Sequence, residues 1–184
     1  MRIILSPAKK MKEDPDTLAY MGLPEFLDQT EEILAWLRSR TQEELKRLWA
    51  CNDRIVGQNV ERLAQMDLRK NLTPAVLSYE GIAYQYMAPA VFETGQFEYI
   101  QEHLRILSAF YGVLRPMDGV TPYRLEMQAK LKTDFCASMY DFWGEDLARL
   151  LDGEGVLLNL ASAEYSRSVR PHLPPGIRVR TPIF

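Results

Sequence analysis

The sequence predicts a mixed α/β fold with a central, largely parallel sheet flanked by helices; a mixed α+β arrangement is the alternative. Three short apolar segments carry this prediction: Arg2–Leu5, Leu104–Leu107 and Val156–Leu158. Polar residues follow each segment directly, and long stretches with helical spacing separate the three. Strands that alternate with helical segments are typical of parallel sheets, because a parallel pair needs a crossover connection.

The first third of the chain predicts one strand and three helices. After the strand at 2–5, residues 9–22 are rich in charge and predict an irregular loop. A helix of about 24–39 follows, because its apolar residues recur at helical spacing. Thr41 and Glu44 form a capping box that opens a second helix, and Asp53 is the expected cap of a third.

The short turn between the second and third helices allows two interpretations. One is an ordinary αα-hairpin; the other is a helix-hairpin-helix, which binds the DNA backbone through its turn amides. The turn Ala50–Asp53 contains no glycine, and this favours the ordinary hairpin. Lys46, Arg47 and Arg54 supply positive charge near the turn and are the candidate DNA contacts of the second interpretation.

The remaining elements are predicted from the same periodicities and turn signals. They are a strand at 75–79 ended by Gly81, a helix through Phe92 that Gly95 interrupts and 97–102 resumes, a strand at 104–108, a helix at about 139–151 closed by Gly153, a strand at 155–159, a short helix through Val169 and a last strand at 177–181.

Length and composition limit the class of protein. The chain has 184 residues, of which 47% are hydrophobic, so we expect a single domain covering 1–184. No segment approaches the roughly 18 apolar residues that span a bilayer, and no signal peptide precedes the first strand; we expect a cytoplasmic protein with no membrane partner. The net charge of −3 argues against a generally basic nucleic-acid coat, although a local basic cleft remains compatible with it.

Polar side chains gather after each of the three strands at 2–5, 104–108 and 155–159. The carboxyl ends of parallel strands meet at one edge of a sheet, where open α/β sheets bind their ligands. We therefore predict one composite polar cleft at this edge. Its twelve candidate residues are Ser6, Lys9, Tyr111, Arg115, Asp118, Tyr123, Arg124, Glu126, Asn159, Ser162, Glu164 and Tyr165.

The residue types in this set fit an anion. Lys9, Arg115 and Arg124 could hold phosphate groups, and the tyrosines could stack on bases or donate hydroxyl groups. The carboxylates would repel phosphate unless they orient the arginines, bind a metal or act as general acid or base. An internal network, with Arg115 paired to Asp118 or Glu164 and Arg124 paired to Glu126, is the structural alternative.

Four motifs resemble a known family. They are Ser6-Pro-Ala-Lys9, Tyr111-Gly-Val-Leu-Arg-Pro-Met-Asp118 with Pro122-Tyr-Arg-Leu-Glu-Met127, Asn159-Leu-Ala-Ser-Ala-Glu-Tyr165, and the weaker Tyr79-Glu-Gly-Ile-Ala-Tyr84. In this order they resemble the YaaA family of bacterial peroxide stress proteins. Ala109 and Phe110 depart from the Gly and Leu usual in the family. The resemblance also implies a longer protein, so we expect this chain to lack a basic carboxyl-terminal segment.

The resemblance implies a DNA-binding protein that limits oxidative damage to DNA during the response to hydrogen peroxide. DNA is then the expected partner, and we expect no cofactor. The alternative is an enzyme acting on a nucleotide or damaged nucleic acid, with Glu126 or Glu164 as the catalytic general base; we favour a protein without catalytic activity. A third interpretation is iron sequestration by Asp118, Glu126 and Glu164, although the spacing of ligand residues does not support a metal site.

Overall fold

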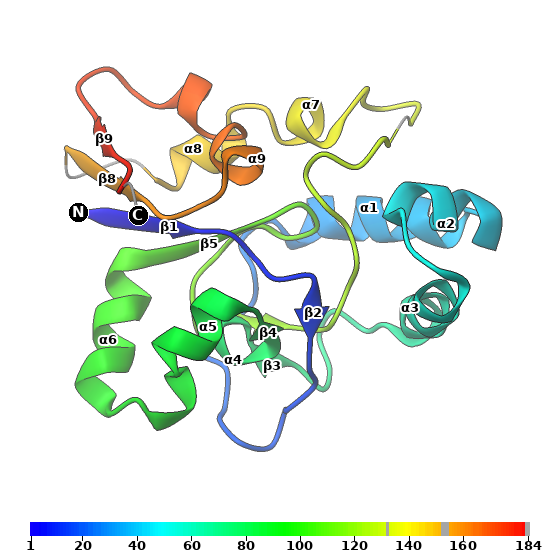
Figure 1. Cartoon of the computed structure of the whole chain (residues 1–184), viewed down its shortest axis with the longest axis horizontal. Helices are drawn as coiled ribbons and strands as arrows, with labels where there is room; N and C mark the ends of the chain where they lie inside the picture. The colour runs from blue at the N-terminus through cyan, green and yellow to red at the C-terminus, as the bar shows by residue number, and fades with distance from the viewer. Residues whose placement is uncertain (132, 152–154, 183–184) are drawn as a thin grey trace.

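A five-stranded sheet forms the centre of the protein, seen in a computed structural model that describes residues 1–131, 133–151 and 155–182 (Figure 1). Its strands are β1 (Arg2–Leu5), β5 (Leu104–Ser108), β6 (Gly112–Leu114), β8 (Val156–Asn159) and β9 (Arg178–Arg180), in the order β6-β5-β1-β8-β9. All neighbours are parallel except β5 and β6. The predicted mixed α/β class with a largely parallel sheet is thus confirmed.

The amino-terminal strand β1 occupies the middle of the sheet. Ile3 pairs with Leu104 of β5 on one side and with Leu158 of β8 on the other. Ile4 is fully buried, which explains why this strand is apolar with no alternation of polar residues. Because β1 is central, the loop after β1 lies between the loop after β5 and the loop after β8.

Helices lie around the sheet in three groups. In the view of Figure 1, α7 to α9 lie above the sheet, α4 to α6 lie below it, and α1 to α3 gather at the right. The helices are α1 (Leu27–Arg38), α2 (Gln42–Trp49), α3 (Asp53–Gln65), α4 (Ala75–Ser78), α5 (Ile82–Met87), α6 (Thr94–His103), α7 (Met139–Trp143), α8 (Asp146–Arg149) and α9 (Ala163–Ser166), with 3-10 turns η1 (Pro89–Val91) and η2 (Arg170–His172). Two small antiparallel ladders join β2 (Lys10–Met11) to β4 (Tyr79–Glu80) and β3 (Thr73–Pro74) to β7 (Gly119–Val120).

The capping box of the second helix is confirmed. The Glu44 backbone N–H donates to Thr41 Oγ1 at 3.3 Å, and the Thr41 N–H donates to Glu44 Oε2 at 2.7 Å. The cap of α3 is Asn52 and not Asp53, because the Asn52 carbonyl oxygen Oδ1 accepts from the Ile55 N–H at 3.0 Å. Ala50 ends α2 in the left-handed region, the conformation for which glycine is usually selected.

The predicted strand at 75–79 is wrong. Residues 75–78 form the short helix α4, and only Tyr79 and Glu80 are extended. Every residue of α4 is buried, so its sequence shows no amphipathic period that would separate a helix from a strand. The N–H groups of Ala75 and Val76 donate to the carbonyls of Asp118 and Pro116, and these bonds anchor the helix.

Three predicted helix boundaries also differ. Gly95 lies in the first turn of α6 and does not interrupt it, because a glycine there loses little in an exposed turn. Gly144, with φ of 45°, divides the predicted helix at 139–151 into α7 and α8. The helix through Phe92 ends at Met87, where Ala88 adopts a left-handed conformation before η1. Gly153, the predicted stop signal, lies outside the described residues.

The described helices include none that is long and apolar enough to cross a membrane.

Candidate functional site

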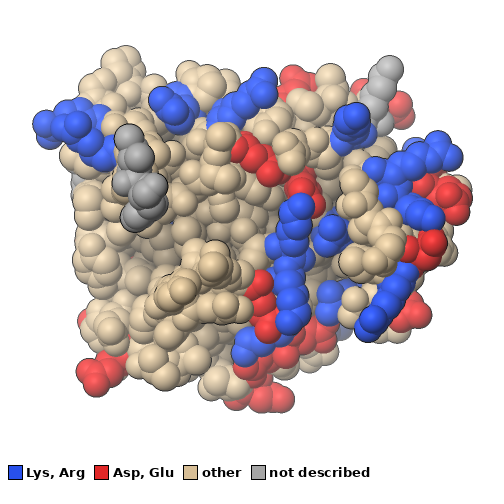
Figure 2. Space-filling model, viewed as in Figure 1, with Lys and Arg blue, Asp and Glu red and all other residues tan. Residues whose placement is uncertain are grey.

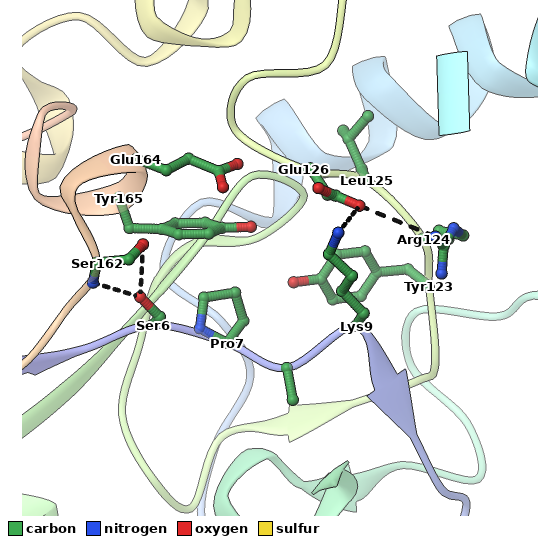
Figure 3. Close-up of a pocket in the computed structure, with 11 residues that line it drawn as sticks. Ser6, Pro7, Lys9, Tyr123, Arg124, Leu125, Glu126, Ser162, Glu164 and Tyr165 are labelled. Atoms are coloured by element: carbon green, nitrogen blue, oxygen red, sulfur yellow. Dashed lines mark hydrogen bonds and ion pairs between the residues drawn. The ribbon is translucent and has the colours of Figure 1, made fainter. Parts of the chain in front are cut away.

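A pocket of about 250 Å³ lies at the carboxyl ends of β1 and β8; we call it the carboxyl-edge pocket (Figure 3). The segment after β1, the loop from Tyr123 to Glu126 and the start of α9 form its walls. Eight of the twelve candidate residues line it: Ser6, Lys9, Tyr123, Arg124, Glu126, Ser162, Glu164 and Tyr165. The segments that bring them together are far apart in sequence and meet because β1 and β8 are parallel neighbours.

Ser6 and Ser162 join two of these walls. The Ser162 N–H donates to Ser6 Oγ at 2.8 Å, and the Ser6 hydroxyl donates to Ser162 Oγ at 3.2 Å. On the other side the Tyr84 hydroxyl donates to the Ser6 carbonyl at 2.8 Å. These bonds fix the loop after β1 against the loop after β8, so the backbone around the pocket is ordered before any ligand arrives.

Three charged side chains meet on the opposite wall. The Lys9 ammonium lies 3.0 Å from Glu126 Oε1, and Arg124 Nη2 lies 3.9 Å from the same oxygen. One carboxylate oxygen therefore faces two cations (Figure 3). The predicted pairing of Arg124 with Glu126 is present, although its length makes it weak and Lys9 holds the closer position.

Arg124 has unused hydrogen-bonding capacity. Its side chain is 15% exposed, and its Nε is buried with no hydrogen-bond partner in the described part of the chain. A buried guanidinium N–H without a partner loses its bond to water and gains nothing in return. An acceptor brought into the pocket would restore that bond.

Buried tyrosines form the floor of the pocket. The Tyr123 hydroxyl hydrogen-bonds Ser108 Oγ at 2.7 Å and the Tyr79 hydroxyl at 2.9 Å, and its ring stacks on Phe110 at 5.0 Å. Burial raises the pKa of Tyr123 to about 12 and moves the pKa of Tyr165 well above its ordinary value. Both side chains are therefore neutral near pH 7 and present hydroxyls and ring faces, not charges.

Four candidate residues lie elsewhere. Tyr111 is buried in the core, where its hydroxyl accepts from the Thr121 N–H at 3.1 Å. Asn159 is buried too: its Oδ1 accepts from the Ala161 N–H at 3.0 Å, so it shapes the turn after β8. Arg115 and Asp118 line a second cavity, which we call the amino-edge pocket, and it shares no lining residue with the first.

Strand β6 explains the displacement of Arg115 and Asp118. The chain reverses at Gly112 and runs antiparallel to β5, so it returns to the amino edge of the sheet before Arg115 is reached. The sequence analysis did not include this three-residue strand. It also missed Tyr79 and Ser108, whose hydroxyls hold Tyr123; the position of Ser108 at the carboxyl end of β5 was the available signal.

Comparison with known proteins decides the family. A family model described as "Peroxide stress protein YaaA" matches residues 1–184. The chain belongs to this family. Its curated relatives include a UPF0246 protein of Agathobacter rectalis, 58% identical over 95% of this chain and 71% of the relative. A UPF0246 protein of Desulfitobacterium hafniense is 52% identical over 100% of this chain and 74% of the relative, and one of Lactobacillus acidophilus is 48% identical over 100% and 73%.

In this YaaA family member, the hairpin of α2 and α3 is a separate candidate contact for DNA. Arg47 and Arg54 are exposed there. The Lys46 ammonium lies 2.5 Å from Asp53 Oδ1, and this ion pair raises the pKa of Lys46. Both side chains are partly exposed, so DNA would have to compete with Asp53 for Lys46. The DNA contact at this hairpin stays a prediction.

The set of three carboxylates that iron would need is not assembled. Glu126 and Glu164 line the carboxyl-edge pocket, whereas Asp118 lies in the amino-edge pocket. Within residues 1–131, 133–151 and 155–182, no three side chains of His, Cys, Asp or Glu are grouped so that they could hold a metal ion. The proposed iron ligands Asp118, Glu126 and Glu164 therefore do not form one site.

Asp118 makes the stability of this protein depend on pH in a direction opposite to that of most carboxylates. Its carboxylate accepts from the Arg115 N–H at 2.8 Å, but burial dominates and raises its pKa from 3.8 to about 6. A pKa raised by folding favours the native state at low pH, and this contribution is lost as pH rises through about 6. The full effect corresponds to about 3 kcal/mol.

Asp118→Asn should therefore gain stability relative to the parent chain between pH 4 and pH 7, by up to about 3 kcal/mol. Urea unfolding at several pH values measures this difference in the free energy of unfolding. The contributions of all other titrating groups cancel in the difference, because both proteins contain them. The exposed Asp141→Asn variant is the control. A difference between parent and Asp118→Asn that stays constant with pH would contradict the raised pKa.

Proposed function

We propose that this protein binds DNA during peroxide stress, and that the carboxyl-edge pocket holds phosphate groups of the DNA backbone. The observation that carries the proposal is the buried Arg124 Nε, which has no partner among the residues that the structure describes. Phosphate oxygens are strong acceptors, and a guanidinium group can offer them two parallel N–H groups. A phosphate in the pocket would satisfy Arg124 once the side chain turns its Nε, which is closed to solvent here, toward the ligand.

The charges in the pocket support an anionic ligand. Lys9 and Arg124 share one oxygen of Glu126, so two positive groups face a single carboxylate. The second carboxylate, Glu164, accepts the Gln128 N–H at 3.1 Å; this bond fixes the group but does not neutralise it, so the support comes from the placement of the charges and not from their sum. Glu126 would then orient the two cations toward the phosphate. This role explains why a carboxylate can lie beside an anionic ligand.

The surface around the pocket supports a chain-like ligand. Lys10 and Lys12 follow Lys9, and Figure 2 shows a band of Lys and Arg side chains over β2, next to an uncharged hollow region. Both of these lysines pair with carboxylates, at 3.1 Å to Glu80 and 2.8 Å to Asp14. Exposed pairs of this kind are weak, so a polyanion can compete for the lysines.

The tyrosines give the same pocket a surface for sugars and bases. Tyr123 and Tyr165 are neutral, and both line the pocket (Figure 3). Aromatic faces stack on bases with little dependence on sequence, and hydroxyls can donate to phosphate. The family's association with peroxide stress supports DNA as the ligand, because protection of DNA is a direct route to peroxide resistance.

The test is a fluorescence-anisotropy titration of a labelled duplex at several salt concentrations. The Lys9→Ala/Arg124→Ala variant should bind at least tenfold more weakly than the parent chain. The slope of log affinity against log salt should also fall by about 2, since each phosphate contact contributes roughly 0.9. The matched control is Lys70→Ala/Arg178→Ala, which removes the same charge from exposed positions outside the pocket.

Equal losses in the two double variants would show that only overall charge matters and would refute the pocket as the DNA site. Absence of binding by the parent chain would refute DNA binding by this chain altogether. Glu126→Gln separates the proposal from an enzymatic role. As a binder this variant should hold DNA more tightly, because the competing carboxylate is gone; an enzyme that uses Glu126 as its base would lose turnover instead.

A further inference from the structure

The amino-edge pocket has a volume of about 380 Å³ and lies at the opposite end of the strands from the carboxyl-edge pocket. Four arginines line it: Arg2, Arg105, Arg115 and Arg149. They come from β1, β5, the residue after β6, and α8. Nothing in the proposed DNA contact uses this cavity.

The sheet forces three of these arginines together. The antiparallel register pairs Ile106 of β5 with Leu114 of β6, so one further step sets Arg105 opposite Arg115. Arg105 also pairs with Ile4 of β1, and Arg2 lies two residues before Ile4 on the same face of the sheet. Like charges at opposing sheet positions are destabilising, so a negative charge would stabilise a fold that sets Arg105 opposite Arg115 with Arg2 close by.

Arg105 is the most buried of the three. It is 8% exposed, and its Nη1 donates to the carbonyls of Gln101 at 3.0 Å and Leu104 at 2.7 Å. These bonds fix the guanidinium but do not neutralise it. Burial lowers the pKa of Arg105 to about 10, and the nearby charges of Arg2 and Arg115 add to the effect, while Asp118 opposes it.

Arg2 has an unsatisfied donor at the same place. Its Nη1 donates to the Glu102 carbonyl, while its Nε is buried and has no hydrogen-bond partner in the described segments. Gln101 adds a neutral group: its Oε1 accepts from the Met117 N–H at 3.0 Å, which leaves the amide NH₂ to donate. Donors therefore converge on this cavity from three elements.

The acidic residues of the pocket do not cancel its positive charge. Among the lining residues that the structure describes, Asp118 and Glu25 are the two carboxylates, set against the guanidinium groups of Arg2, Arg105 and Arg115. Arg149 is excluded from this comparison because it pairs with Glu145 and with Asp146, the latter at 3.0 Å. Three cations against two anions leave an excess of one positive charge, on a wall that includes a buried arginine.

We propose that the amino-edge pocket is a second anion site, which takes a compact oxyanion such as a phosphate group. The described residues that line it include no aromatic side chain, so they offer no stacking surface for a base. Guanidinium forks from adjacent strands match the oxygens of a tetrahedral anion. The ligand is therefore a small phosphate species or the phosphate end of a small molecule, and this site is independent of the carboxyl-edge pocket.

Thermal unfolding and calorimetric titration with inorganic phosphate test the proposal, with sodium chloride at equal ionic strength as the reference. Phosphate should raise Tm more than chloride does, and Arg115→Gln should weaken phosphate binding about tenfold. Arg115 is exposed, so this variant should fold. Arg149→Gln is the matched control: it removes the same charge from the same pocket, but from an arginine already paired, and should change affinity less than twofold.

The titration is repeated in the Lys9→Ala/Arg124→Ala protein to separate the two pockets. Phosphate binding that persists there and is lost on adding Arg115→Gln supports a site at the amino edge. Equal losses in Arg115→Gln and Arg149→Gln, or no effect of either inorganic phosphate or a phosphate monoester beyond that of chloride, would overturn the proposal. Binding that needs a phosphate monoester such as ribose 5-phosphate and is not seen with inorganic phosphate would keep the site and assign it to the phosphate end of a small molecule.

Discussion

Replacing Trp143 with alanine is expected to lower the free energy of unfolding by about 4 kcal/mol, the typical cost of deleting a large buried ring. Trp143 is 1% exposed, and its ring packs against Phe26 at 5.5 Å and Phe142 at 5.0 Å between ring centroids. Its indole N–H also donates to the Ala109 carbonyl at 2.9 Å, so the substitution leaves a buried acceptor without a partner.

Urea unfolding followed by circular dichroism measures this loss, and Tm should fall by roughly 10 °C. Trp36→Ala is the control. Trp36 is half-buried on α1 and carries the Arg40 guanidinium over its ring at 5.0 Å, so its removal should cost about 1 kcal/mol. Equal losses in the free energy of unfolding for the two substitutions would show that the packing of Trp143 contributes no more to stability than that of Trp36.

Gly112→Ala is the second large expected effect, a loss of about 3 kcal/mol or more. Gly112 has φ of 77°, where a side chain is strained. A Cβ atom there would lie 2.8 Å from Phe26 Cδ2, 3.0 Å from Trp143 Cζ3 and 3.1 Å from Leu147 Cδ2. Strain and overpacking add, because Trp143 and Leu147 are fully buried and cannot easily move, while Phe26 is partly buried.

Gly57→Ala in α3 is the control with the opposite sign. No atom lies within 4 Å of a Cβ at Gly57, so alanine should stabilise the helix by about 1 kcal/mol. Combining Gly112→Ala with Trp143→Ala tests the mechanism, because the smaller residue at 143 relieves one of the clashes. The cost of Gly112→Ala should then shrink; an unchanged cost would assign it to backbone strain and to the remaining contacts with Phe26 and Leu147.

The three motif-bearing strands could be predicted because each is a short apolar run with a polar turn behind it. The same reasoning predicts four residues of the carboxyl-edge pocket: Ser6, Lys9, Ser162 and Glu164. They follow β1 and β8, and the parallel pairing of these two strands brings the following loops to the same edge of the sheet. Tyr123, Arg124 and Glu126 belong to the predicted set because they lie in the polar loop that follows the strand at 104–108. Their position in the pocket depends on a loop whose path no local pattern specifies.

The failures have equally specific causes. Arg115 and Asp118 follow Leu114 in the sequence as closely as Ser6 follows Leu5, but β6 had already reversed the chain. A three-residue strand that begins at a glycine carries too few side chains to show an alternating pattern. Helix α4 was misassigned because tertiary burial of all four residues removed the periodicity.

The central position of β1 has a consequence for the order of folding. Ile3 pairs with Leu104 and Leu158, which follow it by more than a hundred residues along the chain. Contacts of such long sequence separation close large loops and slow folding. Helices α1 to α3 form with local contacts in the meantime, whereas Ser6 and Ser162 can meet only when the sheet closes. The carboxyl-edge pocket therefore requires the closed sheet, and a chain that ends before Ser162 contains most of its lining residues but not the pocket.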